Sequence, residues 1–430
     1  MQKIVKLSVI SSALLLAQFA SAAGITVNPV SAETTQVTRH KNKTTIDIAP
    51  ANTHGVSYNA YDQFNVNKHG VVFNNREAGA GTIINEVLST EKSQLRGNMH
   101  VDGKKAHLII ANPNGIACNG CSVSGAEKLT LAAGKAVISQ EGEFLGYYGN
   151  TGTIRFNQIN DDAFSSVQRL AVIAGNIDFR DSNVRTPNLT LFTGHELVKY
   201  IPGGIRDLEA LQSDSDQTGK LTIRHGSRIK TDDLHISANN AMIKNHGEIE
   251  TGPVNNPQKQ RYMNSQLTMD LMNSVLTNGN KGIIRTTKID SVLKNSTLTN
   301  NGNIQIDGDH KITAIGRAII NNKGNISATA THIRGLDGIE TGVGINNHGS
   351  MSGSLFIKAN TVALNNKKYL EALDIATDSD VLAYINDGEI MDGEIMNETA
   401  KFRAYELYHS GNGKISSTPV FESEIKKSLP

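Results

Sequence analysis

The sequence predicts an all-β protein, a right-handed parallel β-helix (a solenoid) with capping strands at its N-terminal end and a few hairpins outside the helix. Three observations predict this fold. The chain is rich in turn-forming residues, with 39 Gly and 43 Asn among 430 residues. A short Asn-Gly signature returns at intervals in the twenties. Between its copies, apolar and polar residues alternate, as they do in half-buried strands.

The repeated signature consists of Asn-rich residues, then Gly, then an apolar residue. Four Gly positions in its copies, 282, 302, 324 and 349, are 20, 22 and 25 residues apart. Further copies and the alternating stretches between them lie at 244–249, 234–238 and 355–359. Such periods are typical of solenoids, in which each unit buries its apolar face only by stacking on its neighbours.

The coils of such a solenoid pair with one another at about 4.8 Å. We expect the Asn residues at the turns to form hydrogen-bonded ladders from coil to coil. A leucine-rich repeat is the rival solenoid, but its leucine spacing and its helix are both missing from the sequence. The aromatic content of 5%, with no Trp, favours a long thin core built from Ile, Leu, Val and Ala.

Residues 1–22 have the pattern of a secretory signal peptide. Lys3 and Lys6 precede an apolar stretch from Leu7 to Ala20, and Ala20-Ser21-Ala22 provides a cleavage site with small residues. The alternative is a membrane anchor, but the apolar stretch is shorter than the roughly 20 residues that span a bilayer. We therefore expect the mature protein to leave the cytoplasm.

One stretch of the strand-rich residues 24–200 is distinctive. Apolar residues lead into Asn112-Pro113-Asn114-Gly115, where Pro stiffens φ and Asn-Gly favours a tight turn. Turn chemistry alone would explain this run as a β-turn between two strands. Shortly after it come Cys118 and Cys121, which are the two cysteines of the chain.

The run Leu108–Cys121 resembles the signature of the two-partner secretion domain. That domain lies at the N-terminus of filamentous haemagglutinins, secreted haemolysins and contact-dependent inhibition exoproteins. The resemblance extends over about residues 24–270, and the repeats that follow resemble the family's β-helical shaft. The close cysteine pair is more similar to the haemolysin and contact-inhibition branches than to the haemagglutinin. The flanking stretches that carry the resemblance are 54–59, 64–66, 70–75, 84–87 and 163–177.

The resemblance implies a route of export and its partners. The unfolded chain would cross the inner membrane through the general secretory translocon. A dedicated outer-membrane β-barrel transporter of the two-partner secretion type would then recognise it in the periplasm, by adding extended strands to an exposed edge. Each coil that folds outside buries surface on a finished template, which would bias transport outward. The product would be secreted or held at the cell surface, where an adhesin would meet a host or neighbouring-cell receptor.

The resemblance also assigns roles to residues. Asn112, Pro113, Asn114 and Gly115 match the motif implicated in secretion. The two Asn side chains would hold the turn by bonds to the backbone, and so act on folding and only indirectly on partner recognition.

A second family motif, Asn-Pro-Asn-Leu, is matched in part. Pro187, Asn188 and Leu189 fit it, but Thr186 replaces the first Asn. Thr can still support a turn, although more weakly than Asn.

The Cys-x-x-Cys pair has three interpretations: a redox pair, half of a zinc site, or a small structural disulfide. A zinc site needs further ligands at set spacing, and a redox site needs its first Cys at a helix N-terminus. Here the flanks are turn and strand, and two nearby thiols pair in an oxidising periplasm. We therefore predict a structural disulfide between Cys118 and Cys121.

The charge balance and the scattered polar residues argue against other classes. With 42 Lys+Arg against 41 Asp+Glu, the chain lacks the basic excess of a nucleic-acid binder. The adjacent acids Asp161-Asp162 and Asp232-Asp233 are candidates for acid/base work, because some parallel β-helices degrade polysaccharides. Neighbours on one strand point to opposite faces, however. We expect no enzyme activity, no metal and no cofactor.

The last part of the chain differs from the middle. From about Lys367 the Asn-Gly rhythm fades, and residues 369–373 and 401–408 are predicted as short helices. A five-residue doubling at 387–396 is expected in a loop. The predicted organisation is a signal peptide at 1–22, a two-partner secretion domain at 23–270, β-helical repeats at 271–366 and an irregular, partly helical tail at 367–430.

Two functional classes follow. The first is a secreted interaction protein, an adhesin or a haemolysin/contact-inhibition-type surface protein or a truncated form of one, exported by its barrel partner. The second is a secreted β-helical enzyme that degrades polysaccharide. The secretion signature favours the first class, whereas acids gathered on one coil face beside a groove would favour the second.

Overall fold

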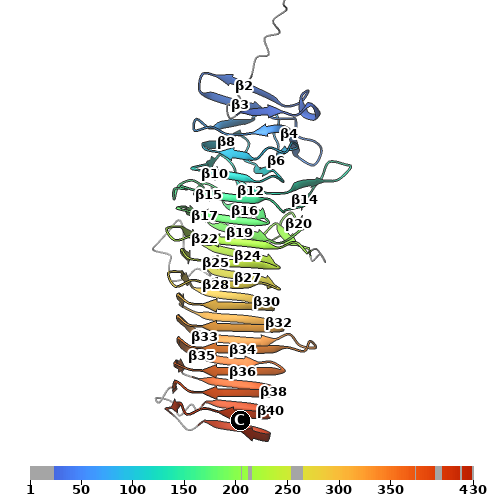
Figure 1. Cartoon of the computed structure of the whole chain (residues 1–430). Helices are drawn as coiled ribbons and strands as arrows, with labels where there is room; N and C mark the ends of the chain where they lie inside the picture. Colours follow the sequence, from blue (N-terminus) through green and yellow to red (C-terminus); the bar gives the residue numbers. More distant parts are fainter. Residues whose placement is uncertain are drawn as a thin grey trace, which may run out of the picture.

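The computed structural model describes residues 24–204, 206–211, 216–252, 265–372, 374–392, 400–416 and 419–428. These residues form a long rod of stacked coils, with the first and the last described strands at opposite ends (Figure 1). Within them, 33 strands join one continuous sheet. The helical structure in the same residues is a single 3-10 turn, η1 (Pro29–Ser31). The predicted all-β parallel solenoid is confirmed.

The middle of the rod has three faces, because each coil there contributes a strand to each of three parallel stacks. The first stack begins where β1 (Ile25–Val27) pairs with β4 in antiparallel fashion. Its strands up to the middle of the rod are β4 (Val56–Phe64), β6 (Thr82–Val87), β9 (His107–Ala111), β12 (Lys128–Ala132), β16 (Arg169–Ala174), β19 (Asn188–Thr193), β24 (Asp233–Asn239) and β27 (Gln266–Met272).

The second and third stacks complete the coils. The second stack consists of β7 (Ser93–Leu95), β10 (Ile116–Asn119), β15 (Thr153–Asn157), β17 (Asn176–Arg180), β22 (Gly219–Ile223), β25 (Ala241–Asn245) and β28 (Val275–Asn278). The third stack consists of β18 (Asn183–Arg185), β23 (Arg228–Thr231), β26 (Glu248–Thr251), β29 (Ile283–Thr286) and β31 (Asn303–Ile306).

In the second half of the rod, long strands bend around a corner and serve two faces. β30, for example, pairs with β27 through its first half and with β28 through its second half. The strands of this half are β30 (Lys288–Asn300), β32 (Asp309–Asn322), β33 (Asn325–Gly335), β34 (Gly342–Asn347), β35 (Ser350–Lys358), β36 (Thr361–Asn366), β37 (Tyr369–Ala372), β38 (Ile375–Asn386), β39 (Glu389–Asp392), β40 (Lys401–Ser410), β41 (Lys414–Ile415) and β42 (Val420–Ser428).

The corner between the first two faces requires a left-handed backbone, and the residues there allow it. Asn240, Asn273 and Asn295 occupy this corner in successive coils with φ of 46°, 48° and 48°. Gly316 follows with φ of 64°, and a Cβ at that position would lie 2.4 Å from the Asn295 side chain. Asn and Gly are the residues that adopt this conformation most readily, which explains part of their abundance.

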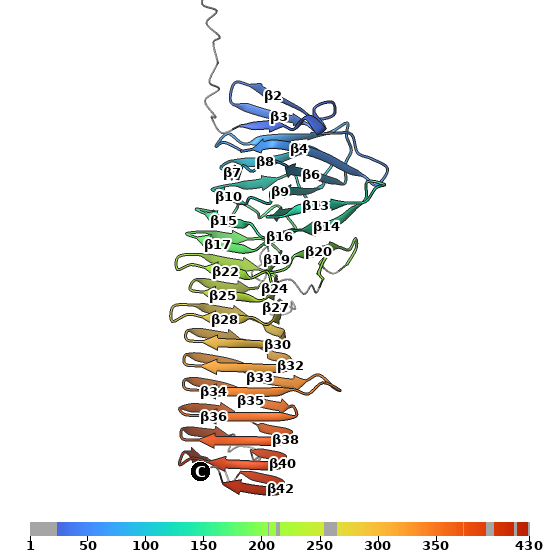
Figure 2. The same ribbon diagram turned by 45° about the vertical axis from the view of Figure 1, so that its right-hand side comes forward.

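Two smaller sheets flank the N-terminal coils. A five-stranded sheet consists of β2 (Gln36–His40), β3 (Lys43–Asp47), β5 (Val71–Asn75), β8 (Asn98–Gly103) and β11 (Ser122–Ser124). An antiparallel sheet outside the solenoid consists of β13 (Lys135–Ile138), β14 (Phe144–Tyr148), β20 (Leu197–Tyr200) and β21 (Leu208–Ala210). Figure 2 shows β13, β14 and β20 beside the stack of β9, β16 and β19.

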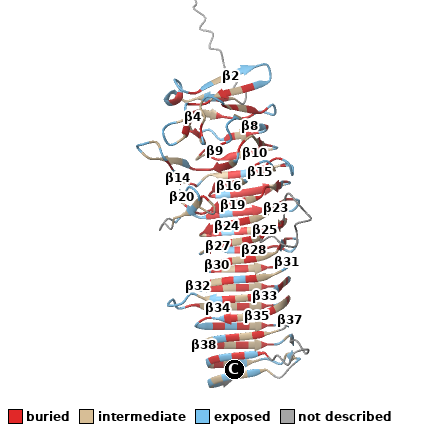
Figure 3. Cartoon of the chain, turned by 180° about the vertical axis from the view of Figure 1, so that it is seen from behind, coloured by how far each residue is buried: buried red, intermediate tan, exposed pale blue. Residues whose placement is uncertain are grey.

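The core follows the period-2 pattern of the sequence. Along the shaft, buried and more exposed residues alternate within each strand (Figure 3). In β30 the inward residues Ile289, Leu293 and Leu298 are at most 1% exposed. A second, smaller core lies beneath the antiparallel outer sheet, where Phe144 and Tyr147 pack on Ile109 and Ile173 of the solenoid.

A ladder of buried Asn side chains runs along the inside of one corner, as the sequence predicted. Each amide nitrogen donates to the amide oxygen of the next coil at 2.8–2.9 Å. From Asn278 onward the partners are 19 to 25 residues apart, which is the length of one coil. The ladder consists of Asn245, Asn278, Asn300, Asn322, Asn347, Asn366 and Asn386, each at most 4% exposed.

The tail differs from its prediction. Residues 369–372 and 401–408, expected to be helical, lie in β37 and β40 and continue the stack. The reason is burial: Phe402 and Ala404 point inward, whereas Lys401 and Arg403 are exposed. In the five-residue doubling, the first copy runs into β39 and most of the second copy lies outside the described residues. The solenoid also continues without a break across residue 270, which lies within β27.

No helix among the described residues has the length and apolar character needed to cross a membrane.

Candidate functional site

The turn at Asn112–Gly115 connects β9 on the first face to β10 on the second. The Gly115 amide donates to the Asn112 carbonyl at 3.0 Å and closes the turn. The Asn112 amide donates to the Ala132 carbonyl of the next coil at 2.9 Å, and the Ser93 amide of the preceding coil donates to the Gly115 carbonyl at 3.1 Å. The turn is therefore fixed between its two neighbouring coils.

Asn112 is the centre of this turn and is completely buried. Its side-chain amide nitrogen donates to the Glu91 carbonyl and to Ser93 Oγ, both at 2.9 Å. Its oxygen accepts the Asn114 backbone amide at 2.9 Å and the Asn114 side-chain amide at 3.2 Å. All hydrogen-bonding positions of the Asn112 side chain are thus used inside the protein.

Asn114 and Gly115 have different parts in the same turn. The Asn114 side chain is half-buried and donates to the Ser89 carbonyl at 2.7 Å, so it ties the turn to the loop of the preceding coil. Gly115 has φ of 110°, and a Cβ there would lie 2.6 Å from the Thr153 carbonyl oxygen. The position admits only glycine without displacement of the backbone.

The two cysteines follow directly. Cys118 lies in β10 and points into the core. A disulfide joins it to Cys121 across the exposed turn at Gly120. Their Cα atoms are 5.2 Å apart, and both residues are completely buried. The disulfide therefore lies in the core between β10 and β11, away from solvent.

The second motif begins β19 and lies at another corner. Thr186 is completely buried and donates through Oγ1 to the Val167 carbonyl at 3.0 Å. The Pro187 carbonyl accepts Thr231 Oγ1 at 2.8 Å and the backbone amides of Asp232 and Asp233 at 2.9 and 3.1 Å. In this chain Thr186 is the buried polar residue of the motif.

Asn188 and Leu189 complete the second motif. The Asn188 side chain donates to the Gln168 carbonyl at 3.0 Å, and Leu189 points into the core with 1% exposure. The two motifs do not meet. Asn188 aligns through the stack with His107 at the start of β9, whereas Asn112 follows the end of β9.

Two buried polar contacts that the sequence did not point to attach the outer sheet. Glu86 is 5% exposed and accepts the Tyr58 hydroxyl at 2.7 Å and the Ala136 amide at 3.2 Å. Burial raises the pKa of this carboxyl, although the Tyr58 hydrogen bond works against the rise. The alternation of residues in β6 does not predict which segment covers Glu86, because its partner Ala136 on β13 is 50 residues further along the chain.

Asp207 makes the second attachment. Its carboxylate accepts Lys128 Nζ and Arg169 Nη1, each at 2.6 Å, and so holds the loop after β20 against β12 and β16. Burial alone would raise the pKa of Asp207, but the hydrogen bonds and charges of Lys128 and Arg169 outweigh it and lower the pKa. The carboxylate is therefore charged at neutral pH.

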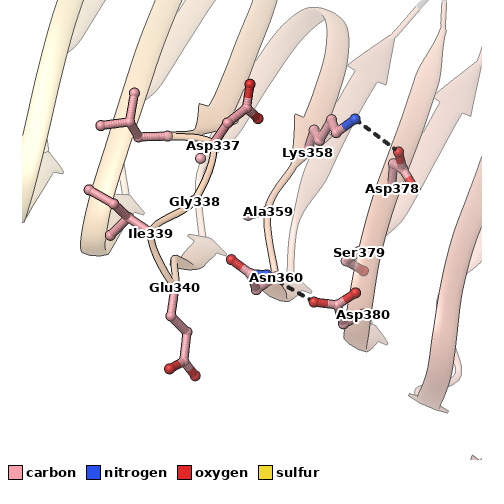
Figure 4. A pocket seen from close by; sticks show the side chains of 12 residues that line it. Asp337, Gly338, Ile339, Glu340, Lys358, Ala359, Asn360, Asp378, Ser379 and Asp380 are labelled. Atoms are coloured by element: carbon pink, nitrogen blue, oxygen red, sulfur yellow. Dashed lines mark hydrogen bonds and ion pairs between the residues drawn. The ribbon is translucent and has the colours of Figure 1, made fainter.

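The acidic pairs considered for catalysis lie in a turn and at the start of a strand. Asp161 and Asp162 are exposed in a turn, and the backbone amides of Asp232 and Asp233 both bond to Pro187. A groove of about 540 Å³ beside the loop 335–340 gathers other acids (Figure 4). There Asp378 pairs with Lys358 at 3.7 Å, and Asp380 accepts the Asn360 amide at 2.9 Å.

The remaining acids of that groove diverge. Figure 4 shows Asp337 and Glu340 pointing to opposite sides of their loop. Across the described ranges, no group of three or more His, Cys, Asp or Glu residues is placed to hold a metal ion. The two acids that β38 contributes to the groove, Asp378 and Asp380, are each bonded to a neighbouring side chain.

The comparison with protein families identifies the domain that contains the Asn112 turn. Residues 23–306 match the family model described as the TPS secretion domain, where TPS denotes two-partner secretion. The chain belongs to this family. Two-partner secretion exoproteins are exported across the outer membrane, so this TPS protein is secreted or displayed at the cell surface.

Individual relatives of this TPS protein carry several names. A tRNA nuclease CdiA of Yersinia mollaretii is 31% identical over 274 residues, 47% of this chain and 9% of the relative. A hemolysin of Proteus mirabilis is 28% identical over 61% of this chain and 18% of the relative. The filamentous hemagglutinin of Bordetella pertussis is 39% identical over 33% of this chain and 4% of the relative. The TPS protein thus spans less than a fifth of the length of these relatives.

Two solved structures are similar in shape. The filamentous hemagglutinin secretion domain has a TM-score of 0.42 at 21% identity, covering 77% of this chain and 96% of that domain. The HMW1 secretion domain from Haemophilus influenzae has a TM-score of 0.48 at 14% identity, covering 94% of this chain and 99% of that domain.

Proposed function

We propose that this TPS protein carries the secretion-directing domain of an exoprotein that acts as an adhesin or as a haemolysin- or contact-inhibition-type surface protein. A dedicated outer-membrane β-barrel transporter exports it after the general secretory translocon has delivered it to the periplasm. The observation that carries the proposal is the match to the family over residues 23–306, which contains the fully bonded Asn112–Gly115 turn.

The turn acts on export through folding. Once its coil has formed, the Asn112 side chain is inaccessible and has used its hydrogen bonds inside the protein. A transporter that read this side chain directly would have to do so before folding. The simpler role is that Asn112 joins consecutive coils, so that the coil emerging outside the cell becomes a template for the next.

Recognition by the transporter uses strand addition. Among the described strands, β2 pairs with β3 alone, and four of its five residues are exposed. It is an edge strand with free backbone groups on one side, which is the kind of surface that takes up an added strand.

Export in the presence and absence of the partner barrel tests the route. The chain is expressed with its cognate barrel or with an empty vector, and the amount in the medium is measured. We expect accumulation in the medium only with the barrel. Equal amounts in both cultures would refute the proposal.

Substitutions at Asn112 test the role of the turn. Asn112→Ala removes four hydrogen bonds, and we expect severalfold less exported protein and less protease resistance of residues 89–157. Asn112→Asp keeps the acceptor toward Asn114 but loses the donors toward Glu91 and Ser93, so it should fail in the same way. The matched control is Asn176→Ala, because Asn176 is exposed in β17. Normal export of Asn112→Asp would show that the bonds from Asn112 to Glu91 and Ser93 of the preceding coil are not needed for export.

A further inference from the structure

Three arginines surround one carboxylate on the second face of the rod. Asp178 accepts Arg180 Nε at 2.6 Å and Arg224 Nε at 2.8 Å, and Arg155 Nε lies 3.6 Å from it. The side chains of Arg155, Arg180 and Arg224 are 45%, 37% and 49% exposed, whereas that of Asp178 is 12% exposed. Burial alone would raise the pKa of Asp178, but Arg224 and Arg180 lower it, so the carboxylate stays charged.

The register of the strands places these residues side by side. Arg155 on β15 aligns with Asp178 on β17, and Asp178 aligns with Thr222 on β22. Arg180 ends β17, two positions after Asp178, and Arg224 comes directly after β22. The Arg224 amide continues the ladder by donating to the Phe179 carbonyl at 3.0 Å. Neighbouring coils are about 4.8 Å apart, so Arg155 and Arg224, one coil to either side of Asp178, can both approach its carboxylate.

The patch carries an excess of positive charge. Lys220 and Lys244 point outward on the same face, next to Asn176 and Thr222 in the register, and no ion pair of either lysine occurs within the described part of the chain. Asp181 follows Arg180 in the chain, and its carboxylate lies beside Gly226, two residues after Arg224. These three arginines and two lysines exceed the carboxylates of Asp178 and Asp181 by three positive charges.

The guanidinium groups are held in place with donors to spare. Arg155 and Arg180 approach Asp178 through Nε, so their terminal nitrogens are not used by this carboxylate. A guanidinium presents five N–H donors in a rigid fork that matches phosphate geometry. Asp178 fixes the side chains and so reduces the entropy lost when an anion binds.

We propose that Arg155, Arg180 and Arg224 form a binding site for a phosphate monoester, with Lys220 and Lys244 extending it along the rod. A phosphate monoester carries −1.5 to −2 charges at pH 7, which fits the excess better than a singly charged sulfate ester or carboxylate. The phosphate belongs to a sugar or to a lipid headgroup, both of which a surface-exposed protein meets.

Binding of glucose 6-phosphate to the full chain tests the site. Titration calorimetry in about 50 mM salt keeps surface electrostatics strong. We expect saturable binding, about tenfold weaker in Arg224→Gln, because charge-assisted hydrogen bonds to the phosphate are lost. Arg155→Lys should also weaken binding, since it keeps the charge but loses the fork. Vesicles with and without phosphatidic acid distinguish the lipid source from the soluble one.

The matched control is Arg285→Gln, which removes the same charge. Arg285 is 46% exposed but pairs with Glu248 on the third face. We expect less than a twofold change in affinity for this variant, and unchanged thermal unfolding for Arg224→Gln. Equal losses in Arg285→Gln and Arg224→Gln would reduce the effect to overall charge and overturn the proposal. So would the absence of binding to both glucose 6-phosphate and phosphatidic acid vesicles.

Discussion

Adjacent asparagines on β34 offer a sharp test of what holds the coils together. Asn347 points inward and is 1% exposed, whereas Asn346 is half-buried on the outer side. The Asn347 amide donates to Asn366 Oδ1 and to the Tyr369 carbonyl, both at 2.8 Å. Its oxygen accepts Asn322 Nδ2 at 2.9 Å and the Gly349 amide at 3.3 Å. Asn346 makes one bond, to Asn321 Oδ1 at 2.9 Å.

The substitution Asn347→Ala removes four buried hydrogen bonds and leaves their partners without one. At about 1 kcal/mol for each bond, we expect a loss of about 4 kcal/mol. For Asn346→Ala, one half-buried bond predicts about 0.5–1 kcal/mol. The pair changes the same residue type in the same strand, so strand propensity and volume cancel in the comparison.

The assay must report on individual coils, because a repeat array can open coil by coil. Hydrogen exchange measured on peptides covering residues 322–366 gives the local free energy of opening, and urea unfolding gives the global value. Asn347→Ala should lower the opening free energy of these coils much more than Asn346→Ala. Equal effects of the two substitutions would refute the view that the inward ladder stabilises the shaft.

Two further predictions concern the N-terminal turn and a buried histidine. Gly115→Ala adds a Cβ 2.6 Å from the Thr153 carbonyl oxygen, so urea unfolding should show a free energy of unfolding lower by about 3 kcal/mol. The control Gly149→Ala has open space around the new Cβ and φ of 67°, so it should lower the free energy of unfolding by only about 1 kcal/mol. His310 is 2% exposed with both ring nitrogens unpaired, and burial lowers its pKa to about 4. In the unfolded chain the pKa of this histidine is about 6.5, so the unfolded chain takes up the proton at a higher pH than the folded protein does. The free energy of unfolding therefore falls as the pH drops from about 6.5 to about 4, and it levels off below that. His310→Leu should reduce that fall by about 1.4 kcal/mol per pH unit, and an unchanged slope would contradict the assignment.

The solenoid and its Asn ladder could be predicted because their signals are local and repeated. An Asn followed two residues later by Gly marks a corner, as at Asn300 and Gly302, and the same pair returns one coil later. The alternation in β30 likewise shows which residues face inward, because a strand has a period of exactly two residues. Length and repetition together leave few other folds.

The tail and the outer sheet could not be predicted in the same way. Residues 401–408 combine Ala, Leu, Glu and Lys, which favour helices, and only the coil beneath them selects a strand by burying Phe402 and Ala404. The outer sheet pairs β14 with β20, whose residues are about 50 positions apart. The two strands pair because both cover the same apolar surface of the solenoid. Other parts of the chain form that surface, so the sequence of neither strand predicts the pairing.

The amide ladder has a direction. In every step from Asn245 to Asn386, the nitrogen points toward the later coil and the oxygen toward the earlier one. The dipoles of these amides therefore add head to tail in a medium of low polarity, and each bond polarises the next. At every coil boundary the side-chain N–H on the N-terminal side therefore meets an acceptor oxygen on the C-terminal side. The two ends of the ladder are therefore chemically different, with an amide oxygen facing outward at the Asn245 end and an amide N–H facing outward at the Asn386 end.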